Sequence, residues 1–188
     1  MLQRKLLAGV ATLGLVAGGS AVAMAAGSAP KHTTINAVTS FKVKINRYVQ
    51  DGTRWQKDVY DVKSGGTITV VNLAASDGPH TFSVVKKSDL PRTANQINNC
   101  KICGTILQEH GFDPQSQGPP TPKFQFVENG TGINTAPAPN VDRPGDSAFI
   151  APSQKAKVTL KVTAKPGTTL YFMCVIHSWM QAKLIVQK

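Results

Sequence analysis

Carboxylate side chains are scarce in this chain of 188 residues, with 10 Asp and Glu against 21 Lys and Arg. The formal charge of +11 would suit a nucleic acid, an anionic membrane surface or an acidic protein. The basic residues stand singly and do not cluster with aromatic residues, so no nucleic-acid partner is expected. A chain with few carboxylates also has few ion pairs for acid to break, which suits work at low pH.

Long helical patterns are also missing, because no long stretch has apolar residues at helical spacing. Strand patterns take their place. Residues 41–45 and 157–163 alternate apolar with polar side chains, which predicts half-buried strands, and further strands are expected at 67–71, 82–85 and 183–186. The sequence therefore predicts an all-β fold, a Greek-key sandwich of antiparallel strands.

One long segment, about 86–147, does not follow the strand pattern. It is rich in Pro, Gly, Asn and Gln, and loops of this length are uncommon in compact domains. We expect a helical turn at 106–110 and an edge strand at 124–127 within it. The chain is thus predicted to be one domain over 27–188, interrupted by a large loop insertion.

The N-terminus has the pattern of an export signal. Arg4 and Lys5 precede an apolar run, 6–26, that ends in small residues suited to cleavage. The run is also about long enough to span a bilayer, which takes ~20 residues. Residues 1–26 are therefore predicted to be a signal peptide or an N-terminal membrane anchor. Either one places the rest of the chain outside the cytoplasm, in the periplasm or on the outer side of the inner membrane.

The chain has only three cysteines, and an odd count in an exported protein indicates one thiol with a special role. Cys100 and Cys103 are predicted to form a local disulfide in an oxidising compartment. Two alternatives stay open for this pair, a metal half-site with His110 and a redox-active dithiol. Haem attachment is excluded, because Gly104 stands where that motif needs His.

The third cysteine opens the most informative motif of the chain. Cys174, His177 and Met180 place a thiolate, an imidazole and a thioether on one short loop between two predicted strands. Soft sulfur donors favour Cu(I), imidazole suits both copper states, and a distant Met tunes the potential. A second imidazole is expected from His80, which opens a strand after the bend at Pro79. These four residues form a candidate site for one copper ion.

This loop, with Tyr171 and Phe172 before it and residues 182–186 after it, resembles that of the cupredoxins. The two-residue gap between His177 and Met180 is similar to the short loop of amicyanin-like members, whereas plastocyanin-like members usually have a longer His-to-Met spacing. The resemblance implies a type 1 copper centre, an electron carrier rather than an enzyme, and His177 with Trp179 as the port for electrons. Charge, insertion and possible anchor are similar to those of the cupredoxin partner of cytochrome oxidase in acidophilic iron oxidisers.

Two positions depart from the cupredoxin pattern. Thr81 follows the first His, where Asn is common in the family and ties the two ligand segments together. Val175 follows the Cys and has no hydroxyl. The hydrogen bonds around the sulfur are therefore expected to differ from the usual ones.

Other copper functions fit less well. A copper chaperone or storage protein tends to have an open site rich in Met or His, whereas this chain has 4 of each and the proposed site takes one Met and two His. A catalytic copper enzyme needs a second metal site, for which only His32 and His110 remain. We therefore expect a periplasmic electron carrier whose partner, a cytochrome or terminal oxidase, has an acidic surface. In acid, His177 must resist protonation for the site to work.

Overall fold

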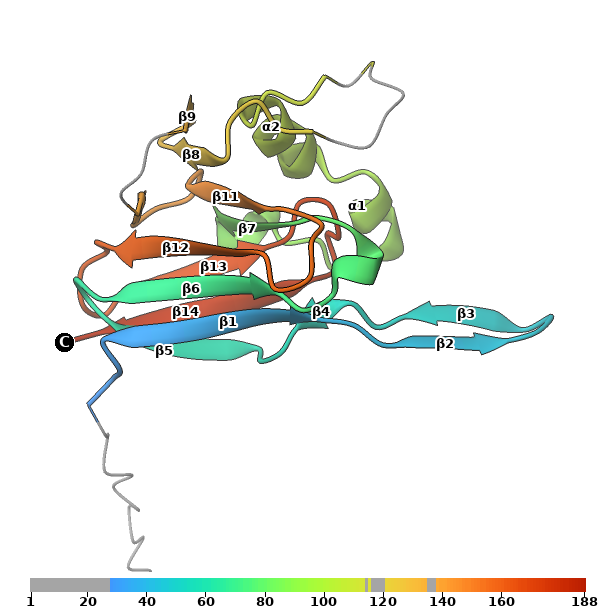
Figure 1. Cartoon of the computed structure of the whole chain (residues 1–188), viewed down its shortest axis with the longest axis horizontal. Coiled ribbons are helices and arrows are strands. Elements are labelled where there is room, and N and C mark those ends of the chain that lie inside the picture. Colours follow the sequence, from blue (N-terminus) through green and yellow to red (C-terminus); the bar gives the residue numbers. More distant parts are fainter. Residues whose placement is uncertain (1–27, 114, 116–120, 135–137) are drawn as a thin grey trace, which may run out of the picture.

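The structure is a computed structural model that describes residues 28–188 except 114, 116–120 and 135–137. The predicted export segment, 1–26, lies outside the described residues. Two sheets pack face to face and form a β-sandwich (Figure 1). The prediction of an all-β sandwich is therefore confirmed.

The smaller of the two sheets has five strands, whose spatial order is β10 (Asn140–Val141), β12 (Lys157–Val162), β6 (Thr67–Asn72), β1 (His32–Val38) and β4 (Arg54–Trp55). The larger has seven, in the order β5 (Val59–Lys63), β14 (Gln181–Gln187), β13 (Thr169–Met173), β7 (His80–Val85), β11 (Ser147–Ile150), β8 (Phe126–Glu128) and β9 (Thr131–Ile133). The strands predicted near residues 67, 82, 157 and 183 are thus β6, β7, β12 and β14.

The sequence had predicted antiparallel strands throughout. The sheets are instead mixed, because three of the strand pairs are parallel. β1 runs parallel to β6, β5 runs parallel to β14, and β10 runs parallel to β12. A parallel pair needs a connection that crosses to the other end of the sheet. Local alternation of residues carries no information on which neighbour a strand will take, so this feature was not predictable.

The core lies between the two sheets and follows from the alternating pattern. In β12 every second side chain, Val158, Leu160 and Val162, is buried. The largest aromatic cluster centres on Phe172 of β13, whose ring centroid lies 4.5 Å from that of Phe82 and 5.5 Å from that of Trp55. Because Phe172 lies two residues before Cys174, the packed core extends up to the candidate ligands.

The segment 86–147 is more ordered than the predicted loop insertion. It contains η2 (Lys87–Asp89), α1 (Ala94–Asn98) and α2 (Lys101–Glu109), and its strands β8, β9 and β10 extend both sheets. The helical turn expected at 106–110 is the end of α2. The edge strand expected at 124–127 is β8, but β8 is not at the edge of the sheet, because β9 pairs beyond it. Cys103 and Ile106 of α2 pack on Val175, so this segment covers one side of the ligand loop.

A hairpin of β2 (Phe41–Lys44) and β3 (Tyr48–Asp51) projects from one end of the sandwich (Figure 1). These strands pair only with each other. Asn46 adopts a positive φ of 57° in the turn. The strand predicted at 41–45 therefore exists, but its expected half-burial is wrong, because Phe41 and Val43 are 67% and 52% exposed.

Candidate metal centre

The ligand loop is the turn between β13 and β14, two neighbouring strands inside the larger sheet. Met173 and Gln181 pair at the end of the ladder. Beyond them the Cys174 amide donates to Met180 O at 3.0 Å, and the Met180 amide donates to His177 O at 2.8 Å. These bonds close the loop on itself and anchor its two ends to the sheet.

His80 reaches the same place from the first residue of β7, where it is fully buried. The bend before it, with η1 (Ala75–Asp77), is held by Asn72, whose side-chain amide donates to Gly78 O at 3.0 Å and to Ala151 O at 3.1 Å. Asn72 Oδ1 accepts from the Ala74 amide. Gly78 has a φ of 95°, a conformation that favours glycine. The backbone therefore positions His80 without help from a metal.

The three donor atoms meet around one point. Cys174 Sγ lies 3.8 Å from His80 Nδ1 and 3.7 Å from His177 Nδ1, and all three donors lie within 4.8 Å of one another. Ligands with bonds of about 2.3 Å to sulfur and about 2.0 Å to nitrogen, at an angle of about 120°, would stand about 3.7 Å apart. The distances thus fit a trigonal site with one thiolate and two imidazoles, the set typical of copper electron-transfer sites.

The fourth predicted ligand, Met180, is fully buried and joined to Cys174 through the backbone. Its side chain belongs to the main core cluster together with Cys174. The position is suitable for a weak axial ligand, and this role of Met180 stays a prediction.

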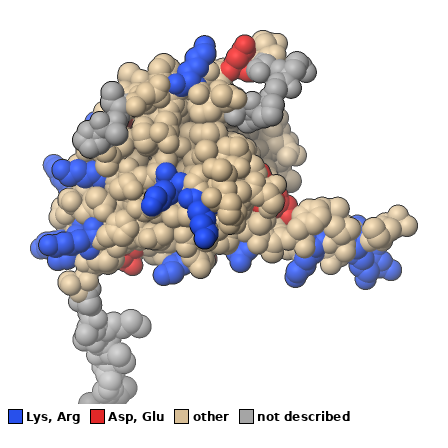
Figure 2. All heavy atoms as spheres, in the orientation of Figure 1, with Lys and Arg blue, Asp and Glu red and all other residues tan. Residues whose placement is uncertain are grey.

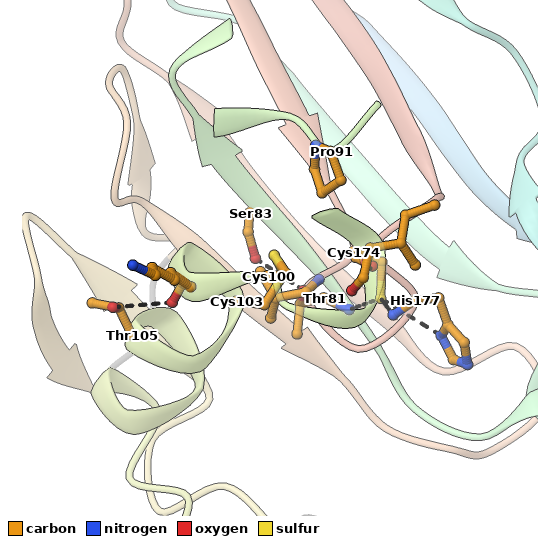
Figure 3. Close-up of a disulfide and its surroundings, with 12 residues drawn as sticks. Thr81, Ser83, Pro91, Cys100, Cys103, Thr105, Cys174 and His177 are labelled. Carbon is orange, nitrogen blue, oxygen red and sulfur yellow. Dashed lines mark hydrogen bonds between the residues drawn. A yellow bond between two sulfur atoms is a disulfide. The ribbon is translucent and has the colours of Figure 1, made fainter. Parts of the chain in front are cut away.

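The sulfur accepts two backbone hydrogen bonds, from the Thr81 amide at 3.3 Å and from the His177 amide at 3.4 Å. Thr81 Oγ1 accepts from the Val175 amide at 2.8 Å. Thr81 therefore ties the two ligand segments together despite its short side chain. Its hydroxyl makes that bond because β7 brings it next to the ligand loop (Figure 3).

Burial controls the protonation of the donors before any metal binds. Burial raises the pKa of the Cys174 thiol, while the hydrogen bonds from the amides of Thr81 and His177 lower it. Burial, together with the charge of His177, lowers the pKa of His80 to about 4. It also lowers the pKa of His177, while Asp51 and Asp77 act in the opposite direction. Burial thus favours the neutral form of both imidazoles, which is the form that binds a metal, and metal binding must displace the thiol proton.

His177 is the ligand closest to solvent, since it is partly exposed while His80 and Cys174 are buried. The Trp179 ring stands edge-on to the His177 ring with centroids 5.4 Å apart. Trp179 Nε1 donates to Thr53 O at 3.0 Å, at the base of the β2–β3 hairpin. The two residues predicted as the electron port therefore lie together at one end of the sandwich.

Cys100 and Cys103 form the predicted disulfide, at the start of α2. The alternative of a metal half-site with His110 is not supported, because the His110 ring is committed elsewhere. Its Nδ1 lies 2.8 Å from Phe124 O and its Nε2 lies 2.9 Å from Ser147 Oγ. These contacts of His110, like those of Thr81, were not predicted from the sequence. A buried strand with hydroxyl residues two apart, Thr81 and Ser83, was the available signal.

Among the described residues, no helix is long and apolar enough to cross a bilayer. No protein-family model matches the chain, and no curated protein matches it either.

Several solved structures are similar to the chain. A dithionite-reduced auracyanin from Roseiflexus castenholzii is 16% identical with a TM-score of 0.37, over 85% of this chain and 99% of that one. The reduced Cu(I) form of an amicyanin mutant is 13% identical with a TM-score of 0.37, over 88% of both chains. A blue copper oxidase from Nitrosomonas europaea is 16% identical with a TM-score of 0.33, over 83% of this chain and 38% of that one.

Proposed function

We propose that the protein is an electron carrier with one copper ion held by His80, Cys174 and His177, and with Met180 as a weak axial ligand. The observation that carries this proposal is the placement of one sulfur and two Nδ1 atoms at trigonal distances from one another. When bound, copper supplies a one-electron step between Cu(I) and Cu(II).

The protein's contribution is a donor set that does not need to rearrange. Cys174 is fixed by the backbone bond to Met180, and its sulfur by the amides of Thr81 and His177. His80 is fixed by the bend that Asn72 closes. Because both oxidation states would find the donors in place, little energy is needed to reorganise the site, and electron transfer is fast.

We propose His177 and Trp179 as the port through which electrons pass, since they lie at the exposed side of the site. Lys and Arg outnumber Asp and Glu on the face shown in Figure 2. A positive surface steers encounters with an acidic partner. A periplasmic cytochrome or terminal oxidase with an acidic docking surface suits this arrangement, with residues 1–26 as the export signal or anchor and 27–188 as one domain.

The test is a visible and EPR spectrum of the copper-loaded protein, recorded with a redox titration. We expect an intense thiolate-to-Cu(II) band, one copper per chain and slow copper exchange. Cys174→Ser should abolish the band, whereas Ser88→Ala, an exposed serine outside the site, should leave it unchanged. Colourless and rapidly exchanging copper would instead support the alternative function, a copper chaperone or storage protein.

A further inference from the structure

A chain of buried hydroxyl groups connects the ligand loop with His110, the C-cap residue that follows α2. The Val175 amide donates to Thr81 Oγ1, and the Ser83 hydroxyl donates to the same oxygen at 2.9 Å. Ser83 Oγ lies 2.7 Å from Ser147 Oγ, which lies 2.9 Å from His110 Nε2. All four side chains are buried, so water does not compete with these bonds.

The elements of the fold explain why these groups meet. In β7, Phe82 points into the sandwich core, so Thr81 and Ser83 on either side of it point to the opposite face. Ser147, on the neighbouring strand β11, pairs directly with Ser83 of β7. Figure 3 shows Thr81 between Ser83 and Cys174.

The number of available protons restricts the direction of the chain, because each hydroxyl can donate once. The Ser83 proton goes to Thr81, so the Ser147 proton goes to Ser83, and His110 Nε2 must then donate to Ser147. His110 Nδ1 faces Phe124 O, which only accepts, and therefore carries a proton too. This direction thus requires a His110 ring protonated on both nitrogens. The Thr81 hydroxyl then keeps its own proton and is free to donate it toward the Cys174 sulfur, which the Thr81 amide already contacts at 3.3 Å.

Loss of the proton from His110 Nε2 reverses the chain. Ser147 must then donate to the bare nitrogen, Ser83 to Ser147, and Thr81 to Ser83. In this second state the Cys174 sulfur keeps its two amide donors and loses the hydroxyl donor. Two protonation states of one distant ring thus correspond to two hydrogen-bond environments of the sulfur.

We propose that His110, acting through Ser147 and Ser83, is a positioning residue that decides whether the Thr81 hydroxyl donates to the sulfur of Cys174. The consequence for electron transfer rests on the proposed function. A hydroxyl donor withdraws electron density from the sulfur and favours Cu(I). Protonation of His110 therefore raises the reduction potential of the site.

The surroundings of His110 move its protonation toward acidic pH. Burial lowers its pKa from the ordinary 6.5, while the Phe124 carbonyl acts in the opposite direction. The only ion pair in the described part of the chain joins Arg143 and Asp142, so no charged partner pairs with the His110 ring. The ionisable residues on the elements packed around it are Glu109, Lys123, Glu128 and Asp146.

The first experiment compares the reduction potential against pH for the copper-loaded wild type, His110→Gln and Ser147→Ala. NMR of the Cu(I) protein follows the titration of His110. A charged His110 would raise the potential by its charge alone, and Ser147→Ala separates the two effects because it keeps the ring and cuts the chain. Ser88→Ala is the matched control on an exposed serine.

In the wild type the potential should rise, and the thiolate-to-copper band should shift, as pH falls through the titration of His110. Both changes should vanish in His110→Gln. In Ser147→Ala, His110 should still titrate while most of the rise and the whole band shift are lost. A Ser147→Ala profile equal to that of the wild type would overturn the proposal.

The second experiment needs no copper, because coupling between two sites is reciprocal. In the metal-free protein, Thr81→Val removes the acceptor of the Ser83 proton, and the proton affinity of His110 should fall at least about five-fold. Ser83→Ala should do the same, and it serves if Thr81→Val does not fold. If the titration of His110 is unchanged in both variants, the coupling through the hydroxyl chain is rejected. If the titration of His110 is shifted in the variants but the wild-type protein binds no copper, the proposed function is rejected and the coupling through the hydroxyl chain is retained.

Discussion

The strands β12 and β2 have the same alternation of apolar and polar residues and opposite surroundings. In β12 the apolar side chains, Leu160 among them, are buried against the other sheet. In β2 the residues Phe41 and Val43 stay exposed, because the strand pairs only with β3 and nothing packs on its face. Alternation therefore predicts a strand with two different faces, and the topology decides whether the apolar face is covered.

The two regions also differ in their relation to the ligands. The core reaches Cys174 through Phe172 and Met173 of β13, whereas the hairpin contacts the ligand loop through the bond from Trp179 to Thr53. Substitutions in the core should thus change stability and copper binding together. Substitutions in the hairpin should change neither.

The largest effect is expected from matched truncations in the two regions. Leu160→Ala should lower the free energy of unfolding by about 2–5 kcal/mol, because it leaves a cavity in the core. Ile45→Ala removes the same number of carbon atoms from a residue that is 79% exposed, and should change it by less than about 0.5 kcal/mol. Urea unfolding measures both. Equal losses would show that the hairpin is covered in solution.

The next effect concerns pH in the metal-free protein. His80 has a pKa of about 4 when folded against an ordinary 6.5, so the unfolded chain binds more protons between these values. Stability should therefore fall as pH falls from 6.5 to 4, by about 3 kcal/mol from this residue.

Unfolding at pH 7 and pH 4 tests this, with His32→Gln, an exposed histidine on β1, as the control. Copper-loaded protein should lose less, because the metal competes with the proton for the same nitrogen. A metal-free protein equally stable at both pH values contradicts the burial of a neutral His80.

A smaller effect is expected where the two regions meet. Trp179→Phe removes the hydrogen bond to Thr53 O and should cost about 1 kcal/mol. Hydrogen exchange should rise in residues 41–51 while the copper spectrum stays the same. A changed spectrum with unchanged exchange would mean that Trp179 supports the ligands and not the hairpin.

The smallest effect should come from hairpin charges. Lys42→Gln with Lys44→Gln should slow electron exchange with hexacyanoferrate, a small anionic probe, by a few-fold at low salt. Stability and potential should not change. Rates that are independent of salt in the wild type would argue against electrostatic steering.

The candidate ligands could be predicted because three of them lie on one short loop and their chemistry is distinctive. Cys174, His177 and His80 were named from donor type and spacing, and the structure brings them together. Several strands of the sandwich could be predicted for a similar reason, because the alternation of apolar and polar residues is a local signal.

Two features of the structure could not be predicted from the sequence. The helix α2 lies in a segment whose Pro, Gly and Asn content indicates a loop, and its buried residues become apolar contacts only when it packs on Val175. The hydroxyl chain joins Thr81, Ser147 and His110, which are far apart in sequence. Thr81 and Ser83, two apart on one strand, were a local signal, but no spacing rule connects such common residue types with Ser147 and His110.

His80 and Cys174 are 94 positions apart, yet their side chains face each other in the finished sandwich. Closing so long a segment is slow compared with forming a hairpin, so we expect this contact to form late in folding. Before that step a copper ion would find only the local donors of the 174–180 turn. The full set of donors thus exists only in a chain that has finished folding, and bound copper draws the population toward that state by mass action.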